Sequence, residues 1–178
     1  GSDIISGNGG NDIITGGAGN DSLTGGADND TFNVDSGTDT ISDLASGDIL
    51  VVSNSATANA TAIVAFVATV GTSNAGTANL TARSAGGTID MSNSASGGYN
   101  IISGAGNDIL TGGSGADIIT ISAATEGDSD VIDGGTGADS ITAGAGADQI
   151  TAGTGADTIA GGAGDDVIIL GASDDSAV

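Results

Sequence analysis

The sequence predicts an all-β fold, a parallel β-roll or β-solenoid in which an irregular β insertion separates two repeat blocks. Three observations predict it: Asp recurs every nine residues along two stretches, a large apolar residue follows two positions later, and Gly fills most places before the Asp. A fixed short period is typical of solenoids, because each repeat buries its apolar face only against its neighbours. We expect the blocks at residues 1–53 and 100–178, with an Ala/Thr/Ser-rich insertion at residues 54–99.

The composition excludes several classes of protein. The 178 residues hold 23 acidic side chains against a single Arg83, for a net charge of −22, with no Cys, His, Trp or Pro. Nucleic-acid binding needs a basic patch, zinc sites of the usual kind need Cys or His, and Ser-His-Asp triads need His. No run of 18 apolar residues is present, so we expect no membrane insertion. Something must neutralise the carboxylates before the Ile side chains pack, which points to a bound cation.

The Asp residues set a nine-residue frame when each is placed at its sixth position. The first block contributes Asp3, Asp12, Asp21, Asp30, Asp39 and Asp48. The second block contributes Asp108, Asp117, Asp130, Asp139, Asp148, Asp157 and Asp166. The step of 13 residues between Asp117 and Asp130 indicates one frame with a four-residue insertion around Ala123–Gly127.

The other columns test this frame. The eighth position is always large and apolar: Ile5, Ile14, Leu23, Phe32, Ile41, Leu50, Leu110, Ile119, Ile132, Ile141, Ile150, Ile159 and Ile168. The fourth position is Gly in most frames, with Asp28, Ser46 and Asp128 as the exceptions. The periodicity therefore extends beyond the residue type that was used to find it.

Each frame reads as a turn followed by a short strand. Gly allows the positive φ of a tight turn, and alternation in the strand sends the eighth position inward and the seventh and ninth outward. Two frames, 18 residues, would close one coil of two strands and two turns. Because coils stack at roughly 4.8 Å, carboxylates one coil apart would lie directly over one another.

Stacked carboxylates repel unless a cation lies between them. Ca²⁺ takes six to eight oxygens from carboxylates and backbone carbonyls, whereas Mg²⁺ demands a tighter octahedron and keeps its waters. Copper or zinc would prefer the His or Cys that are missing here. The predicted calcium sites are the pairs Asp3/Asp21, Asp12/Asp30, Asp21/Asp39, Asp30/Asp48, Asp108/Asp130, Asp117/Asp139, Asp130/Asp148, Asp139/Asp157 and Asp148/Asp166. The turns at Asp39 and Asp48 lack the leading glycine pair, and the insertion precedes Asp130.

The best repeat units resemble a known family. They are GGAGNDSLT (16–24), GGSGADIIT (112–120), GGTGADSIT (134–142) and GGAGDDVII (161–169). They are similar to the glycine-rich nonapeptide of the RTX (repeats-in-toxin, haemolysin-type) calcium-binding proteins. The resemblance covers residues 1–51 and 100–170, and it implies a parallel β-roll that binds Ca²⁺.

The insertion is expected to continue or buttress the solenoid. Thr61–Val70 is apolar and β-branched enough for a buried strand, and Thr88–Ser92 is a second candidate strand. We expect Phe66 and Tyr99 to be packing residues and Arg83 to be a surface charge or a salt-bridge partner. The remaining acids are expected to be solvated rather than ligating: Asp35, Asp43, Asp90, Asp133, Asp174 and Asp175.

These features predict a structural calcium-binding module of a secreted bacterial surface protein, and not an enzyme. The composition resembles that of surface-layer (S-layer) proteins, which are secreted by type I machinery, so we expect an extracellular, cell-surface location. The expected partners are Ca²⁺, copies of the parent protein and cell-surface polysaccharide. Extracellular modules bind Ca²⁺ at about 10⁻⁴–10⁻³ M, so folding would follow export.

Two alternatives stay open at this stage. The chain could be an extender or adhesin arm, or the calcium-binding tail of a secreted protease or lipase whose catalytic part lies elsewhere. We expect the chain to be a piece of a longer polypeptide, because it opens within a repeat. An ice-binding role is disfavoured, because the ninth positions of the first block do not form a regular Thr ladder.

Overall fold

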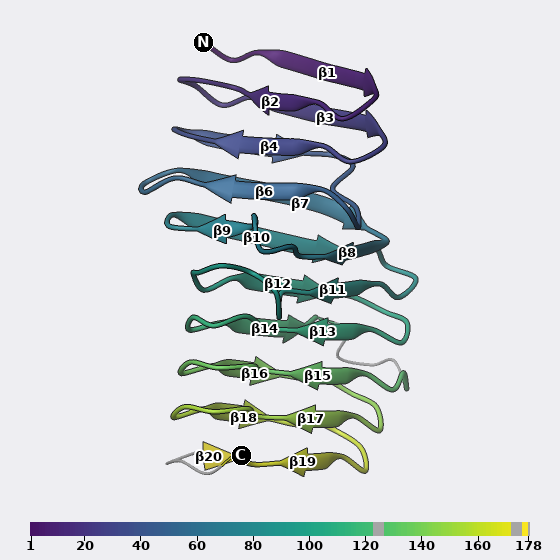
Figure 1. Ribbon diagram of the computed structural model, residues 1–178. Helices are drawn as coiled ribbons and strands as arrows, with labels where there is room; N and C mark the ends of the chain where they lie inside the picture. The colour runs from purple at the N-terminus through teal and green to yellow at the C-terminus, as the bar shows by residue number, and fades with distance from the viewer. Residues whose placement is uncertain (123–126, 172–175, 178) are drawn as a thin grey trace.

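The computed structural model describes residues 1–122, 127–171 and 176–177, and these residues form strands, turns and loops without a helix (Figure 1). The chain winds as a parallel β-solenoid, with its two termini at opposite ends of the stack of coils (Figure 1). The predicted fold class is therefore confirmed. No helix long and apolar enough to cross a membrane occurs in the described residues.

The strands belong to three parallel sheets. Sheet A has ten: β1 (Ile4–Gly9), β3 (Ser22–Ala27), β5 (Thr38–Ile41), β7 (Thr57–Ile63), β10 (Thr77–Ala82), β12 (Asn100–Ser103), β14 (Ile118–Ile121), β16 (Ser140–Thr142), β18 (Thr158–Ala160) and β20 (Ser176–Ala177). Sheet B has four: β2 (Ile13–Thr15), β4 (Thr31–Val34), β6 (Ile49–Val52) and β9 (Ser73–Asn74). Sheet C has six: β8 (Ala65–Val67), β11 (Thr88–Asp90), β13 (Ile109–Thr111), β15 (Val131–Asp133), β17 (Gln149–Thr151) and β19 (Val167–Ile169).

The coil has the predicted length within the two repeat blocks, apart from the coil with the insertion, whereas the coils between the blocks are longer. Ile4 pairs with Ser22 in the first block, and Ser140 pairs with Thr158 in the second, so residues one 18-residue coil apart are neighbours. Sheet A runs unbroken from β1 to β20, so the segment between the blocks continues the solenoid rather than buttressing it from outside. The division into segments 1–53, 54–99 and 100–178 remains a prediction.

The interior is the column of eighth-position side chains. Eleven of the thirteen are fully buried, and Ile5 and Ile168 at the outer coils are partly buried against the same core. The seventh and ninth positions face outward, as in Ser140 and Thr142 on either side of buried Ile141. Alternation along three-residue strands thus produces one thin apolar core with polar outer faces.

The insertion departs from expectation in its first half. Thr61–Val70 is not one buried strand, because it turns the corner between β7 of sheet A and β8 of sheet C. The corner includes Ala62 with φ of 58° and exposed Val64, and Val70 beyond β8 is also exposed. Thr88–Ser92 does contain a strand, β11, and Phe66 and Tyr99 are fully buried, so these predictions are confirmed.

The turns line up along two edges of the solenoid. We call the turns that lead from sheet A into sheets B and C the first edge, and the turns that lead back into sheet A the second edge. Sheet B ends at β9, and sheet C begins at β8, so the coils between the two blocks are the place where one back sheet replaces the other.

Candidate metal sites

The thirteen Asp side chains of the frame stack in columns along the two edges, and the column of the first edge is divided between the blocks, where sheet C replaces sheet B. The first edge holds Asp12, Asp30, Asp48, Asp108, Asp130, Asp148 and Asp166. The second edge holds Asp3, Asp21, Asp39, Asp117, Asp139 and Asp157. Asp3 is exposed at the first coil, Asp12 and Asp166 are half-buried, and the other ten are buried. Burying so many carboxylates is expensive unless each finds a compensating partner.

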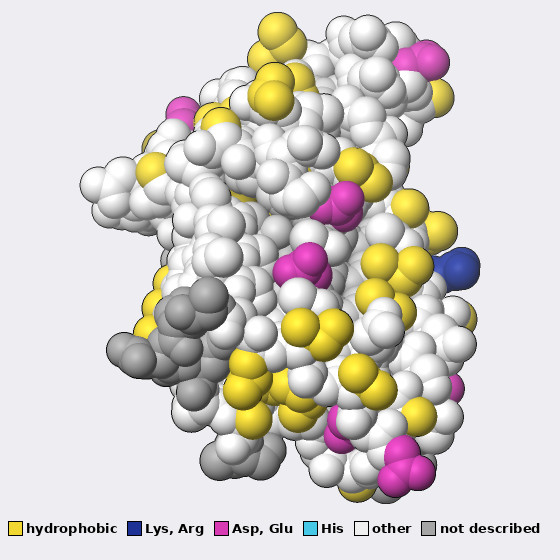
Figure 2. Space-filling model, turned by 60° about the horizontal axis from the view of Figure 1, so that its bottom comes forward, with side chains coloured by type: hydrophobic (Ala, Val, Ile, Leu, Met, Phe, Trp, Pro, Cys, Tyr) yellow, Lys and Arg dark blue, Asp and Glu magenta, His cyan; other side chains and the backbone are white. Residues whose placement is uncertain are grey.

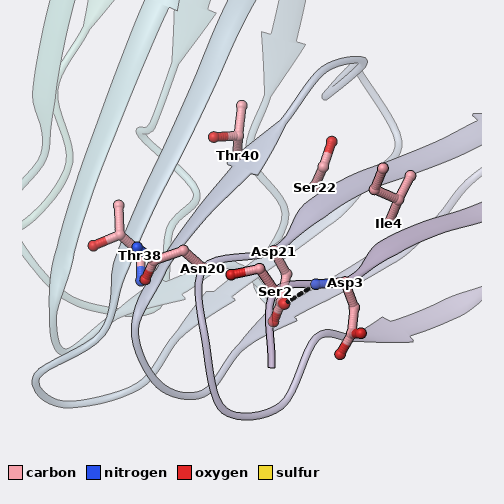
Figure 3. A pocket seen from close by; sticks show the side chains of 8 residues that line it. All are labelled: Ser2, Asp3, Ile4, Asn20, Asp21, Ser22, Thr38 and Thr40. Carbon is pink, nitrogen blue, oxygen red and sulfur yellow. Dashed lines mark hydrogen bonds between the residues drawn. The ribbon is translucent and has the colours of Figure 1, made fainter.

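A repeated hydrogen bond links the backbone of each Asp to the carboxylate of the Asp in the next coil. The backbone N–H of Asp3 donates to Oδ1 of Asp21 at 2.8 Å, the dashed line in Figure 3. The same bond links every one of the nine predicted pairs, at distances from 2.8 to 3.1 Å. The structure therefore brings all nine pairs together, including the Asp108/Asp130 pair, whose members are 22 residues apart in sequence. Whether each pair holds a metal ion stays a prediction.

The second carboxylate oxygen, Oδ2, is available to a cation where it accepts no hydrogen bond. Oδ2 of Asp48 and of Asp117 is not free in this sense, because it accepts the N–H of Ala45 at 2.8 Å and of Gly113 at 2.7 Å. Among the described residues, Oδ2 is buried without a hydrogen-bond partner in Asp12, Asp21, Asp39, Asp139 and Asp148. A buried acceptor without a donor costs about 1–3 kcal/mol, and more when it is charged. The chain has a single cationic side chain, Arg83, which is far too few to neutralise this set.

Where the first position of a repeat is Gly, that glycine makes room for Oδ2; Ala143 and Ala152 hold the same position before Asp148 and Asp157. A Cβ added at Gly134 would lie 2.8 Å from Oδ2 of Asp139, and one at Gly161 would lie 2.6 Å from Oδ2 of Asp166. Neither glycine has a positive φ, so steric demand accounts for both. At Gly161 the nearest atom is Oδ2 of Asp166, whereas at Gly134 the carbonyl oxygen of Ala152 lies closer still than the Asp139 carboxylate. The turn is thus shaped around the Asp side chain.

Gly is needed at the fourth position of the repeat for a different reason. Gly155 has φ of 142°, and a Cβ there would overlap the carbonyl oxygen of Gly137 in the preceding coil. Gly164 stacks on Gly146 in the same way. Successive turns therefore pack backbone on backbone, and their carbonyl groups lie next to the carboxylate columns.

The arrangement fits a hard divalent cation. No cluster of three or more His, Cys, Asp or Glu side chains suited to a metal occurs in the described part of the chain. Two stacked carboxylates would therefore supply only part of the six to eight oxygens that Ca²⁺ takes, and backbone carbonyls of the turns would supply the rest. Such a donor set contains no nitrogen or sulfur, which disfavours zinc and copper.

Burial changes the protonation of the columns. It raises the pKa of five carboxyls, those of Asp39, Asp48, Asp108, Asp117 and Asp148. Burial is also the largest cause for Asp130 and Asp139, whose pKa values rise to about 6, and neighbouring carboxylates raise them further. A bound cation would counter both effects.

Three acids outside the frame have contacts that the sequence did not predict. Asp28 and Asp128, which replace the fourth-position glycine, accept hydrogen bonds from the N–H of Gly10 at 3.2 Å and of Gly106 at 2.6 Å. Asp43 is half-buried, and its two oxygens accept the N–H groups of Gly25 and Gly26 at 3.0 and 2.8 Å. Asp43 is therefore held by the backbone rather than simply solvated, and the expectation that it does not ligate a metal stays a prediction.

The other charged residues outside the Asp columns differ in their surroundings. Asp90 and Asp133 accept local N–H bonds from Ser92 and Gly135, and Asp35 is exposed. Asp174 and Asp175 lie outside the described residues, as does most of the four-residue insertion at Ala123–Gly127. Exposed Arg83 donates from Nε to the carbonyl oxygen of Gly86 at 2.8 Å.

We expect Gly16→Ala to weaken calcium binding in the first block. The new Cβ would lie inside van der Waals contact of the Asp21 carboxylate, including its Oδ2 atom, and would displace it. The calcium midpoint of the circular-dichroism change should rise several-fold. Gly9→Ala is the matched control, because a Cβ there meets nothing within 4 Å and its φ is not positive. Equal midpoints for both variants would contradict this account of the glycine.

Protons should compete with the metal. A carboxyl whose folded pKa is about 6 binds a proton more tightly when folded than when unfolded, near 3.8. The calcium-free fold is therefore favoured at low pH and loses this contribution as pH rises through about 6. The calcium midpoint should be several-fold higher at pH 5.5 than at pH 7.5, as measured by titration at both values. A calcium midpoint independent of pH would contradict the competition between protons and calcium.

Comparison with known protein families finds four copies of the RTX calcium-binding nonapeptide repeat, at residues 6–41, 96–120, 125–159 and 151–177. Together these matches span more than half of the chain. No curated protein and no solved structure matches. The repeat matches overlap both stretches in which the Asp columns lie, although Asp3 and Asp48 are outside the matched ranges.

Proposed function

We propose, from the premise that this chain belongs to the RTX calcium-binding nonapeptide repeat family, that it is a structural calcium-binding module of a secreted bacterial surface protein. The observation that carries the proposal is the set of nine stacked carboxylate pairs, in which Asp12, Asp21, Asp39, Asp139 and Asp148 bury an Oδ2 atom without a hydrogen-bond partner. Calcium ions between successive turns would neutralise both columns, and the thirteen frame Asp residues named above would be the side-chain ligands. The module is proposed to act through its fold rather than through catalysis.

The net charge supports calcium-dependent folding after export. At −22 and without Ca²⁺, the outer coils would bury mutually repelling carboxylates. Binding to the folded state alone stabilises it in proportion to the logarithm of ligand concentration. The two acidic repeat blocks would therefore stay expanded where free Ca²⁺ is scarce and fold at the cell surface, where it is abundant.

A calcium titration tests this proposal. The chain is first treated with a chelator, and far-UV circular dichroism is then followed as Ca²⁺ or Mg²⁺ is added. A gain of β-structure at millimolar Ca²⁺, and none with Mg²⁺ at the same concentration, is the expected result. No response to Ca²⁺ would mean that the Asp columns are ordinary turn residues.

Within this class we favour an S-layer protein: the full-length protein that contains this module would assemble with other copies of itself. Outward positions of sheet C carry Ile109, Val131 and Val167, each about half exposed. Figure 2 shows hydrophobic side chains gathered in small groups on one face, among backbone and uncharged polar atoms. Copies of so acidic a chain repel until cations neutralise them, so assembly should need Ca²⁺. Electron microscopy of the parent protein should show sheets with Ca²⁺ and dispersed particles with chelator.

An extender arm is the second candidate. The unbroken sheet A favours it, because one continuous sheet makes a single solenoid rather than two linked units. An arm of this kind would fold with Ca²⁺ but stay monomeric. Analytical ultracentrifugation in millimolar Ca²⁺ distinguishes the two, since lattice formation predicts growing assemblies and an arm predicts a monomer. Cell-surface polysaccharide remains a proposed partner of either form.

A further inference from the structure

The charge of this chain is confined to its two outer parts. Residues 1–48 hold nine Asp and residues 108–178 hold thirteen acids, whereas residues 49–107 hold only Asp90 and Arg83 and are neutral. We call residues 49–107 the hub and the two flanking parts the arms. The hub contains β6 to β12, so it spans several complete coils in the middle of the solenoid (Figure 1).

Neutral residues replace Asp in the hub's share of both columns. On the second edge, Ala58 pairs with Asp39 and Ala78 pairs with Ala58. Tyr99 then occupies the next place, because its N–H donates to Oδ1 of Asp117 at 2.6 Å. On the first edge, Gly87 donates to Oδ1 of Asp108 in the same way. The hub therefore brings no buried carboxylates of its own to the columns.

Side-chain amides tie the hub coils together instead. Nδ2 of Asn79 donates to Oδ1 of Asn59 at 2.7 Å, and Nδ2 of Asn100 donates to Oδ1 of Asn79 at 2.8 Å. This amide ladder crosses β7, β10 and β12. Buried Asn74 adds a bond from Nδ2 to the carbonyl oxygen of Gly98 at 2.6 Å. None of these bonds requires a metal ion.

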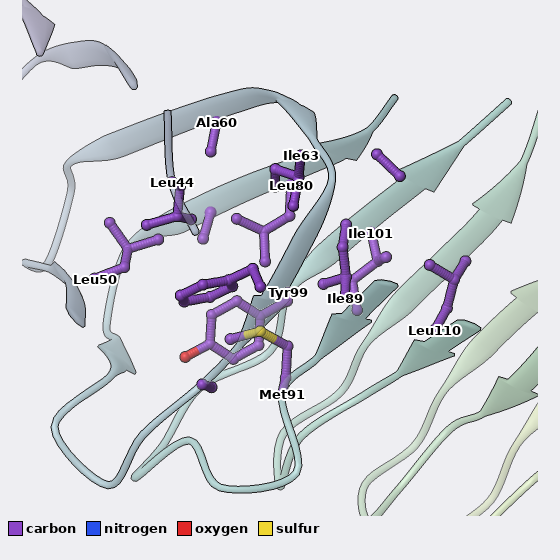
Figure 4. Packing of buried hydrophobic residues seen from close by; sticks show 14 of the residues in the cluster. Leu44, Leu50, Ala60, Ile63, Leu80, Ile89, Met91, Tyr99, Ile101 and Leu110 are labelled. Atoms are coloured by element: carbon purple, nitrogen blue, oxygen red, sulfur yellow. The ribbon is translucent and has the colours of Figure 1, made fainter. Parts of the chain in front are cut away.

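The hub also holds much of the large apolar volume. Phe66, Met91 and Tyr99 are fully buried there. Met91 and Tyr99, both labelled in Figure 4, lie against the same residue, because a Cβ added at Gly113 would be 3.6 Å from Cε2 of Tyr99 and 3.7 Å from Cβ of Met91. The Tyr99 hydroxyl is 2.5 Å from Oγ of Ser94 and donates to the carbonyl oxygen of Ser96 at 3.2 Å, so its polar tip is satisfied. Aromatic side chains contribute the largest buried areas in such a core.

We propose that the hub is folded without calcium and is the template on which the two calcium-dependent arms fold. The strands at its two ends, β6 and β12, present paired backbone to β4 and β14, so each arm adds coils to an existing edge. Starting from an existing coil avoids the entropic cost of forming the first one. The inference rests on the proposed function, because it takes the arms to need Ca²⁺.

Hydrogen exchange on the full chain tests it. In chelator, amides of β7, β10 and β11 should exchange at least about 100-fold more slowly than amides of β3 and β16, and Ca²⁺ should then protect the arms. If hub amides exchange as fast as arm amides in chelator, the inference is wrong, and protection of the arms by Ca²⁺ would leave the proposed function standing. If the arms are already protected in chelator, both are wrong.

A paired substitution adds a second readout. Asn79→Ala removes the middle of the amide ladder and should speed hub exchange in chelator about tenfold, without changing the number of calcium ions bound. Asn93→Ala, at an exposed position of a hub turn, is the matched control and should leave exchange unchanged. Identical exchange profiles for the two variants would overturn the proposal, because the ladder would then not hold the hub coils together.

Discussion

Asp139→Asn should lower calcium binding sharply and yet leave the calcium-free chain no less stable. Asp139 lies in the middle of the second-edge column, where it accepts the N–H of Asp117 and donates its own N–H to Oδ1 of Asp157, both at 2.8 Å. Asn keeps the accepting Oδ1 but replaces the buried, unpartnered Oδ2 with a donor. The two predicted sites that share Asp139 should be lost, and the calcium midpoint of this block should rise about tenfold or more.

The effect of Asp139→Asn on stability without Ca²⁺ shows whether Asp139 is a metal ligand or only a turn residue. Burial raises the pKa of Asp139 to about 6, so its charge opposes folding at neutral pH when no cation is present. Removing that charge should therefore not destabilise the calcium-free state. Calorimetric titration gives the stoichiometry, and Asp165→Asn, at an exposed position in the same block, is the control. Equal loss of stability with and without Ca²⁺ would identify Asp139 as a structural turn residue only.

Phe66→Ala should cost about 3–5 kcal/mol of unfolding free energy, by analogy with other buried Phe truncations. Phe66 is fully buried in β8 and pairs with Ile89 of β11 within the hub. Because no column carboxylate lies in this coil, added Ca²⁺ should not restore the loss. Urea unfolding followed by the fluorescence of Tyr99, the single Tyr in a chain without Trp, measures it locally.

Val67→Ala is the matched control for this truncation. Val67 is the next residue of β8, but its side chain is partly exposed on the outer face of sheet C. Its truncation should cost less than about 1 kcal/mol. Similar losses of unfolding free energy for the two variants would mean that Phe66 is not packed in the hub core as we describe.

The parts of the fold that follow the nine-residue period could be predicted from the sequence. The inward Ile141 and the stacked Asp139 and Asp157 follow from the period, because a constant coil length fixes which residues are neighbours. The insertion before Asp130 did not disturb this, since the extra residues leave the strands of sheet A and sheet C in register.

The remaining features could not be predicted, for two physical reasons. Between the blocks no glycine pattern marks the turns. The apolar run Thr61–Val70 therefore gave no sign of the corner at Ala62 or of the replacement of sheet B by sheet C. The contacts of Asp28 and Asp43 reach across one coil, to Gly10 and to Gly25 and Gly26. Only the 18-residue offset applied to every acid would have suggested them.

The most direct test of the central claim, that calcium ions lie between stacked carboxylates along both edges of the arms, is a crystal structure of the chain grown in Ca²⁺, with anomalous scattering to locate the ions. The account predicts ions between successive turns at pairs such as Asp21/Asp39 and Asp139/Asp157, with Oδ2 among the ligands, and none at the edges of the hub. Arms folded with water or no density at these positions, or ions bound only on the outer faces, would contradict it.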